Sequence, residues 1–261
     1  MATTEYLKES NEHLLFLLPG QSLPPSAFWD FPLNDGTTHA MNIFNSGIDV
    51  IMFDPVGYGK NKQFYQYDRI EYTNQIQSVQ TRTYKSKTIF GFSTTTAPAL
   101  IAADRGLFDK VIIHSPSIRK DPKYYTKHDD VFSTSVDRLK TERIAKISDK
   151  LIPKPNRING WEEKLITVIG KTEWKVPASV VYDINNYYPK HGKYGFNPIN
   201  IKSFLSIIGE YDYEITTGGY ELCKSIFPDM EEVIIPNSTH FSMWENNYEK
   251  TVNTIIEYCK R

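Results

Sequence analysis

A single serine, Ser93, separates two unlike stretches of the sequence. Residues 87–92 read KTIFGF, whose β-branched and aromatic side chains are typical of a buried strand, while residues 94–104 are mostly small and favour a helix. A hydroxyl at such a junction suits a nucleophile, because a helix N-terminus favours developing negative charge and Gly91 leaves room for a sharp turn. The other interpretation is that Ser93 only caps the helix, which serine does well.

A nucleophilic serine needs a base, and the base needs a group that orients it. Asp212 lies three residues after Gly209, just past the apolar run SFLSIIGE, and His240 follows the apolar run EEVIIPN. Ser93, Asp212 and His240 therefore each follow a predicted strand. Because the carboxyl ends of parallel strands meet at one edge of a sheet, we expect the three side chains to lie at that edge.

The elements that position these residues alternate between strands and helices. Strands are predicted over residues 13–19, 49–54, 88–92, 110–116, 203–210 and 231–237. Helices are predicted over residues 38–46, 68–83, 94–104, 216–226 and 248–260. This alternation predicts an α/β fold with a mostly parallel, doubly wound sheet of about six strands.

The alternation is interrupted between residues 118 and 200. Unstructured loops rarely reach this length within a compact domain, and helical spacing occurs over residues 136–151 and 161–169. We therefore expect residues 118–200 to form an inserted, mainly helical cap over a core made of residues 1–117 and 201–261. The segment holds 16 Lys and Arg against 10 Asp and Glu, a net charge of +6. That charge fits either an anionic substrate or an ordinary solvated surface.

Composition and charge argue against several classes of protein. The chain carries a formal net charge of −1, so no basic excess points to nucleic acid, and no apolar run is long enough to span a membrane. The N-terminus lacks a signal-peptide pattern, and the two cysteines, Cys223 and Cys259, fit a reducing compartment. We therefore expect a cytoplasmic protein with no cofactor and no metal site; His39, His128 and His191 lack ligand spacing and are expected at the surface.

Five segments in order resemble the α/β-hydrolase fold superfamily. GFSTT is similar to its nucleophile elbow, DVIMFDPVGYGKNK to its D-x-x-G-x-G segment, and LLPGQSLPPSAFWDFP to its oxyanion loop. GEYD is similar to the acid loop and THFSMWEN to the histidine loop, with its following aromatic residue and glutamate. The resemblance covers nearly the whole chain outside the 118–200 segment.

The resemblance implies a role for five candidate site residues. Ser93 would be the nucleophile, His240 the general base and acid, and Asp212 the group that orients the imidazole. Backbone N–H groups of Gln21 and Thr94 would form the oxyanion hole. Position alone assigns three further residues to the substrate pocket. Phe28 and Trp29 lie in the oxyanion loop and are expected to shape the acyl end of the pocket, and His114 ends a predicted strand and is expected in the pocket wall or in a structural role. Asp54 is expected to anchor the turn through Gly57 and Gly59.

Three features depart from the family pattern. The second glycine of G-x-S-x-G is Thr95, a β-branched residue that can crowd the elbow. The usual His-Gly pair of the oxyanion loop reads Pro19-Gly20. About a dozen residues precede the first predicted strand, so the N-terminal hairpin of larger members is expected to be missing.

The sequence therefore favours a serine hydrolase that cleaves a small or medium ester, thioester or amide through an acyl-enzyme. A thioesterase or acyl transferase acting on a carrier-bound chain stays open, as do a lyase or carbon–carbon hydrolase using the same three residues and a non-enzymatic ligand-binding protein. The expected partner is a small-molecule acyl substrate, and the oligomeric state is left open.

Overall fold

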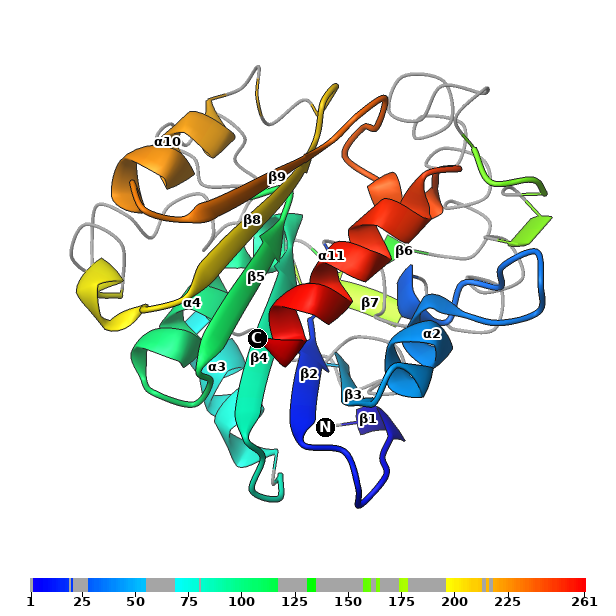
Figure 1. Ribbon diagram of the computed structural model, residues 1–261. Helices are drawn as coiled ribbons and strands as arrows, with labels where there is room; N and C mark the ends of the chain where they lie inside the picture. The colour runs from blue at the N-terminus through cyan, green and yellow to red at the C-terminus, as the bar shows by residue number, and fades with distance from the viewer. Residues whose placement is uncertain are drawn as a thin grey trace.

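The computed structural model describes residues 2–18, 20, 28–54, 69–79, 81–116, 131–134, 157–160, 163–164, 174–177, 196–212, 215 and 218–261. Within that part of the chain the main sheet has seven strands in the order β1-β3-β2-β4-β5-β8-β9 (Figure 1). The strands are β1 (Ala2–Tyr6), β2 (His13–Leu17), β3 (Ile48–Asp54), β4 (Ser86–Phe92), β5 (Lys110–His114), β8 (Phe204–Gly209) and β9 (Glu231–Ile235). Every neighbouring pair is parallel except β1 and β3, which are antiparallel.

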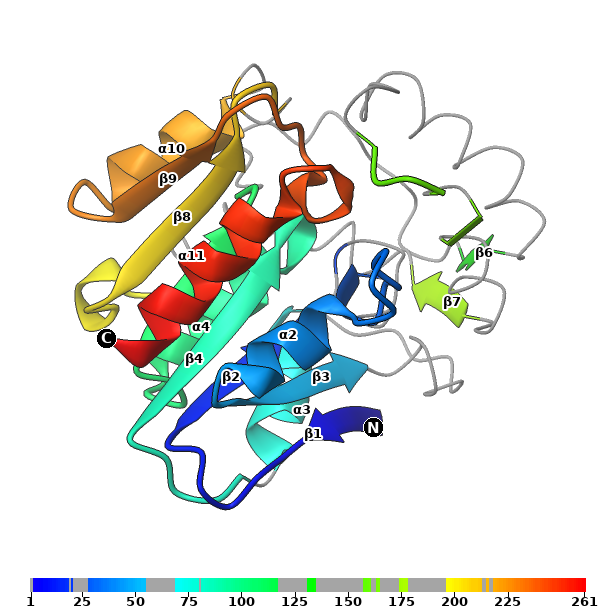
Figure 2. The same ribbon diagram turned by 45° about the vertical axis from the view of Figure 1, so that its right-hand side comes forward.

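Helices cover both faces of the sheet (Figures 1 and 2). They are α2 (His39–Asn45), α3 (Arg69–Ser78), α4 (Thr96–Asp104), α10 (Gly219–Ile226) and α11 (Tyr248–Lys260), with short 3-10 turns η1 (Ser93–Thr95), η4 (Pro198–Asn200) and η5 (Ser242–Trp244). Side chains of α2 and α11 pack in one hydrophobic cluster with one face of the sheet, and those of α3, α4 and α10 pack in a second cluster on the other face.

The central strands are buried on both faces, which explains their continuous apolar sequences. All seven residues of β3 and all six of β8 are buried. These strands and the helices between them lie where the sequence predicts, so the doubly wound, mostly parallel architecture is confirmed.

The predicted strand count is wrong by one, because β1 was missed. The sequence places the first strand at His13, yet Ala2–Tyr6 pairs with β3 from Ala2 opposite Asp54 to Tyr6 opposite Val50. The side chains of residues 3, 4 and 6 are partly buried and that of residue 5 is exposed. The sequence of β1 therefore lacks the alternation of apolar and polar residues that predicts a strand. Its position at the edge of the sheet depends on backbone pairing with a strand more than 40 residues away.

The segment predicted to be a helical cap contains a two-stranded antiparallel sheet that the sequence did not indicate. Strands β6 (Val131–Thr134) and β7 (Trp174–Pro177) pair with Val131 opposite Pro177 and Thr134 opposite Trp174. The predicted helix over 136–151 lies outside the described residues, as does that over 161–169 apart from Glu163 and Lys164, which are helical. The mainly helical cap and its boundaries stay predictions.

Two residues of the segment predicted to be a cap contact the loop before α11. The backbone N–H of Ile158 donates to the carbonyl of Trp244 at 3.2 Å, and Arg157 forms an isolated antiparallel bridge with Glu245. Ile158 is itself buried in the cluster that contains α2 and α11. Residues 157–158 therefore dock on the segment that follows His240.

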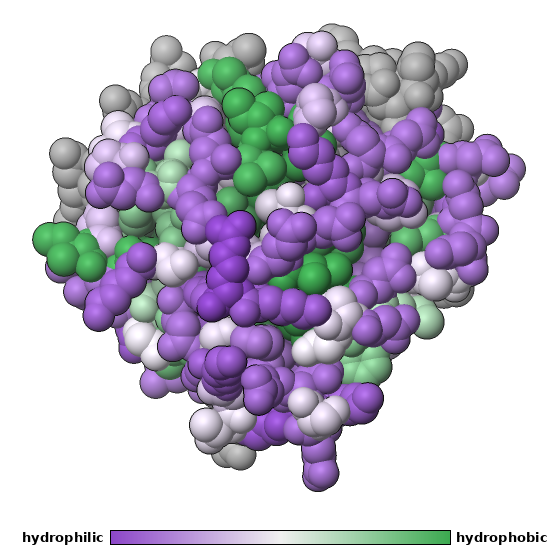
Figure 3. All heavy atoms as spheres, in the orientation of Figure 1, coloured by the Kyte–Doolittle hydropathy of each residue, from purple (hydrophilic) through white to green (hydrophobic). Residues whose placement is uncertain are grey.

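The surface on the α11 side is mostly hydrophilic, with apolar side chains gathered over β9 and at η4 (Figure 3). Ile234 on β9 is 47% exposed and Ile199 in η4 is 84% exposed. The described residues include no helix long and apolar enough to cross a membrane.

Candidate active site

The chain turns sharply where β4 meets α4, and Ser93 occupies that turn. Ser93 has φ of 51°, a left-handed conformation that is uncommon outside glycine and costs of order 1–3 kcal/mol. A Cβ added to Gly91 would lie 2.8 Å from the carbonyl oxygen of Thr95 and 3.0 Å from Cβ of Ala99, so only glycine fits there. The strained serine is thus held at the carboxyl end of a central strand, in front of the N-terminus of α4.

Thr95 stabilises this turn and does not crowd it. Its hydroxyl accepts a hydrogen bond from the backbone N–H of Phe92 at 2.8 Å and donates to the carbonyl of Phe92 at 3.1 Å. Thr96 adds a hydrogen bond from its hydroxyl to the carbonyl of Ser93. The departure from the family's second glycine therefore supplies a side-chain clasp between the two ends of the elbow.

Asp212 and His240 are brought together by two adjacent loops. The Nδ1 atom of His240 lies 3.0 Å from Oδ1 and 3.2 Å from Oδ2 of Asp212, and both side chains are almost fully buried. The acid loop after β8 and the histidine loop after β9 are joined by a hydrogen bond from Tyr211 N–H to the carbonyl of Ser238 at 2.8 Å. Gly209 allows this approach, because a Cβ there would collide with the carbonyls of Ser238 and Thr239.

The imidazole of His240 lies beside the elbow. Its ring centroid is 5.0 Å from that of Phe92, the residue that immediately precedes Ser93. Ser93, Asp212 and His240 are each at least 95% buried. The structure therefore places all three predicted residues at the carboxyl edge of the sheet, where β4, β5, β8 and β9 end.

A buried carboxylate fixes the residue before His240. Both carboxylate oxygens of Glu245 accept from the backbone N–H of Thr239 at 3.1 Å, and Oε1 also accepts from the Thr239 hydroxyl at 2.7 Å. Burial raises the pKa of Glu245, the negative charge of Asp212 adds to that rise, and the hydrogen bonds from Thr239 oppose it. Glu245 belongs to the THFSMWEN motif, but the sequence did not predict that its carboxylate binds Thr239.

The expectation that His39 lies at the surface is wrong. His39 is completely buried on the inner face of α2, and its Nε2 atom donates to the carbonyl of Met243 at 2.7 Å. Burial lowers the pKa of His39 to about 4, so the ring is neutral near pH 7. His39 shares the buried face of α2 with Ala40 and Ile43, and Ile43 lies four residues further on, at the helical spacing that marks an inward face.

The two aromatic residues assigned to the substrate pocket lie in the core beside the elbow. The ring of Phe28 lies 4.8 Å from that of Phe92 and stacks on Trp244 at 4.8 Å, and Trp244 stacks on Phe241 at 5.1 Å. Trp29 meets the edge of Phe90 at 4.8 Å and is 1% exposed. Contact of Phe28 or Trp29 with a substrate stays a prediction.

His114, the third residue assigned to the pocket, is completely buried at the end of β5. Its Nε2 atom lies 2.7 Å from the hydroxyl of Ser242, and its ring lies 5.1 Å from that of Phe92. Burial lowers the pKa of His114 to about 3. The ring is therefore a neutral hydrogen-bonding group beneath the histidine loop.

The oxyanion donors are only partly within the described structure. Gln21 and Pro19 lie outside the described residues, as do Gly57 and Gly59 of the D-x-x-G-x-G segment. Thr94 lies in η1, directly after Ser93. Gly20 does approach the elbow, since a Cβ there would collide with the ring of Phe92 and lie 3.3 Å from Phe28. Gly20 therefore lies next to the turn that holds Ser93.

A metal site was not expected from the sequence. Within the described ranges no three His, Cys, Asp or Glu side chains gather in a way that would hold a metal ion. Ser93, His240 and Asp212, which lie at the carboxyl edge of the sheet, are residue types that nucleophilic catalysis uses.

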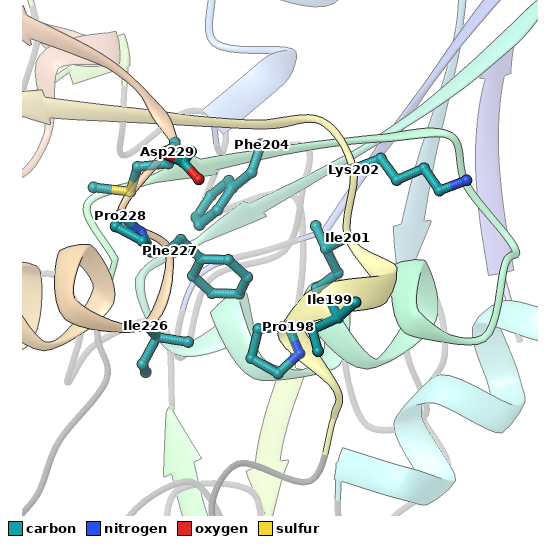
Figure 4. A pocket seen from close by; sticks show the side chains of 10 residues that line it. Pro198, Ile199, Ile201, Lys202, Phe204, Ile226, Phe227, Pro228 and Asp229 are labelled. Atoms are coloured by element: carbon teal, nitrogen blue, oxygen red, sulfur yellow. The ribbon is translucent and has the colours of Figure 1, made fainter.

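A cavity of about 340 Å³ lies elsewhere on the molecule (Figure 4). Its walls come from η4, the start of β8 and the turn between α10 and β9, and include Ile199, Phe204, Phe227 and Met230. Because β8 runs away from it toward Asp212, this cavity lies at the amino edge of the sheet. It is separate from the Ser93 turn.

Comparison by sequence finds no relatives, since no protein-family model and no curated protein matches the chain. Comparison with solved structures does find similar proteins. The similar structures include esterases, a monoacylglycerol lipase, a thioesterase domain, another hydrolase and a bromoperoxidase, with TM-scores above 0.6 over nearly the whole chain. The chain therefore has the α/β-hydrolase fold, as the resemblance implies.

Three of these structures illustrate the kinds of protein that share the fold and how similar they are to this chain. A thermophilic esterase from Thermogutta terrifontis has a TM-score of 0.67 and 15% identity, over 99% of this chain and 92% of that one. The thioesterase domain of the curacin biosynthetic pathway has a TM-score of 0.65 and 12% identity, over 100% and 99%. A monoacylglycerol lipase from Paleococcus ferrophilus has a TM-score of 0.62 and 17% identity, over 99% and 98%. At these identities the likeness shows the fold alone.

Proposed function

We propose that this protein is a serine hydrolase that cleaves a carboxylic ester, thioester or amide through an acyl-enzyme, with Ser93, His240 and Asp212 as its catalytic residues. The observation that carries the proposal is the buried His240–Asp212 pair, 3.0 Å apart, with the imidazole 5.0 Å from the ring of Phe92 beside a left-handed serine. A serine that only caps α4 would need neither the strained φ nor the neighbouring pair.

The reaction follows from the role of each group. The Oγ of Ser93 attacks the substrate carbonyl while Nε2 of His240 takes its proton, and Asp212 holds Nδ1–H and stabilises the imidazolium. Backbone N–H groups of Thr94 and Gln21 donate to the oxyanion, and each such donor is typically worth about 2.7–4 kcal/mol. His240 then returns the proton to the leaving group, and water, activated by the same imidazole, hydrolyses the acyl-enzyme.

The elements around the three residues support a rigid site. The clasp of Thr95 on Phe92, the anchoring of Thr239 by Glu245 and the bond from His39 to Met243 restrain the elbow and the histidine loop. Such restraint keeps catalytic groups in productive geometry before substrate binds. The restraint falls on the loops that carry Ser93 and His240, as catalysis by these residues requires.

A second candidate is hydrolysis or transfer of an acyl thioester bound to a carrier. The net charge of +6 over residues 118–200 favours it, because a carrier presents its chain through an anionic phosphate. The chemistry at Ser93 would be the same, and the two candidates differ only in the leaving group.

The test is labelling with a fluorophosphonate, a probe that phosphonylates activated serines. Wild-type protein should be labelled at Ser93, whereas Ser93→Ala protein and His240→Ala protein should not be. A surface variant such as Ser225→Ala is the matched control and should label normally. Folded wild-type protein that resists the probe would contradict the proposal. Turnover of p-nitrophenyl esters against acyl-thioesters of matched chain length then separates the two candidates.

A further inference from the structure

We propose that His114 and Ser115 are positioning residues that hold the backbone of His240 from the end of β5. For its effect on turnover the inference rests on the proposed function; for its effect on the His240–Asp212 geometry it stands alone. The sequence did not indicate this role, since it left His114 as a pocket-wall or structural residue and gave Ser115 no role.

A chain of buried hydrogen bonds links three elements under the histidine loop. Thr251 on α11 lies 2.9 Å from the Ser242 hydroxyl, which lies 2.7 Å from Nε2 of His114. Nδ1 of His114 lies 3.2 Å from the hydroxyl of Ser115, which donates to the carbonyl of His240 at 3.3 Å. The four side chains in this series of hydrogen bonds are completely buried: Thr251, Ser242, His114 and Ser115. Water cannot replace a bond that is lost here, so each one matters to the geometry.

The direction of every hydrogen follows from the donors available. The Ser115 hydroxyl uses its one hydrogen on the His240 carbonyl, so Nδ1 of His114 must donate to Ser115. The buried, neutral ring then has Nε2 free to accept, and it accepts from Ser242. The Ser242 hydrogen is thereby committed, so Thr251 donates to Ser242. All hydrogens point the same way, from α11 toward the His240 carbonyl, and bonds in such a chain strengthen one another.

The backbone of Ser115 indicates that this arrangement is more than packing. Ser115 has φ of 54°, a left-handed conformation in which glycine is far less strained. A glycine there would keep the turn but would lose the hydroxyl that reaches His240. Ser115 therefore keeps a strained backbone conformation at a position where its hydroxyl bonds to the histidine loop.

His114 also reaches His240 through its ring. Phe92 lies 5.1 Å from His114 on one side and 5.0 Å from His240 on the other. The histidine loop is thus restrained at the His240 carbonyl and at Ser242, two residues later. Loss of either restraint should let the imidazole rotate away from Ser93 without changing how substrate binds, and misplacement by about 1 Å costs on the order of a hundredfold in rate.

The test compares three variants with a stability control. Ser115→Gly keeps the left-handed backbone but loses the hydroxyl, His114→Phe keeps the ring but loses both hydrogen bonds, and His114→Asn restores a donor near Nδ1. We expect kcat for a p-nitrophenyl ester to fall about 10- to 100-fold in the first two with KM unchanged, and to recover partly in His114→Asn. Phe227→Leu, in the core cluster on the far face of the sheet, controls for general destabilisation.

A second readout does not depend on turnover. The Nδ1 proton of His240 in its bond to Asp212 gives a far-downfield proton resonance, and we expect it to broaden or shift in Ser115→Gly and His114→Phe but not in Phe227→Leu. If the resonance and kcat in both folded variants stay within twofold of wild type, the positioning role is wrong. If wild type hydrolyses nothing yet the resonance responds as expected, the proposed function fails and the positioning role stands.

Discussion

The Nδ1 atom of His240 lies 3.0 Å from Oδ1 of Asp212, with the two side chains 3% and 0% exposed. An imidazole held this way in a dry environment presents Nε2 on its opposite side. The acid follows β8 and the histidine follows β9, so the adjacency of these parallel strands is what brings the pair together.

The Asp212–His240 bond should dominate the rate. In Asp212→Asn protein the side chain can donate to Nδ1 and favour the wrong tautomer, so we expect kcat for an activated ester to fall about 10³- to 10⁴-fold with little change in KM. Asp229→Asn, at the amino edge of the sheet, is the matched control and should behave as wild type. A loss of less than tenfold in folded Asp212→Asn protein would count against the assigned role.

The hydrogen bonds between Thr95 and Phe92 should contribute measurably to the free energy of unfolding. Thr95→Val keeps the shape of the side chain but leaves the buried N–H of Phe92 without its acceptor, which costs about 1–3 kcal/mol in the free energy of unfolding. Thr95→Ser keeps the hydroxyl and should lose about 1 kcal/mol or less, for one buried methyl group. Urea denaturation of both variants checks this, and equal loss in the two would show that the hydroxyl does not contribute.

His39 should make stability fall as the pH is lowered from about 6.5 to about 4. Its pKa in the folded protein is lowered to about 4 by burial, so the unfolded chain takes up a proton in this interval that the folded protein refuses. The free energy of unfolding should therefore drop on acidification, by up to about 3 kcal/mol from this residue.

His39→Gln is the variant that isolates this effect, because glutamine does not titrate and can still donate to the Met243 carbonyl. Its stability should depend less steeply on pH than that of wild type over the same interval. Parallel pH profiles for the two proteins, measured by chemical denaturation, would contradict the assignment.

Asp49 should make the stability of the protein depend on pH in a lower range than His39 does. Its buried carboxylate accepts from Arg82 at 3.0 Å, Tyr84 at 2.8 Å, Asn11 at 2.8 Å and the N–H of Lys8 at 2.9 Å. Burial acts to raise the pKa of Asp49, but these hydrogen bonds outweigh it and lower the pKa below the usual value. The resulting stabilisation is present above the usual aspartate pKa and is lost as the pH falls below about 4.

Asp49→Asn should accordingly destabilise the protein by about 2 kcal/mol at pH 7, since a hydrogen bond to a charged group contributes about 1.5–3 kcal/mol. The difference from wild type should stay constant down to about pH 5 and shrink below pH 4. Asp109→Asn at the surface is the control. A difference that is independent of pH would mean that Asp49 is not ionised in the folded protein.

Much of this fold can be predicted from the sequence because its signals are local. The apolar runs of β2, β3, β4, β5 and β8 are buried on both faces, and the glycine and serine at the elbow mark a turn. The right-handedness of parallel crossovers then limits the possible strand orders to a few. Asp212 and His240 were found because each lies just past such a strand.

Most of the features that the sequence did not indicate depend on partners far along the chain, whereas the Thr95 hydrogen bonds to Phe92 depend on the shape of a local turn. β1 is held by pairing with β3 and carries no apolar pattern, and β6 pairs with β7 across 40 residues. The inward orientation of His39 is set by a carbonyl 204 residues away, and the clasp of Thr95 by the local backbone of a turn whose shape the sequence leaves open. Side-chain types alone do not specify such pairings.

The most direct test of the account is an experimental structure of the protein after reaction with a fluorophosphonate. We expect phosphorus bonded to Oγ of Ser93, Nε2 of His240 within hydrogen-bonding reach of that oxygen (about 2.6–3.2 Å), and Asp212 still paired to Nδ1. Phosphorus on a different residue, or an imidazole at position 240 turned away from the modified serine, would contradict it.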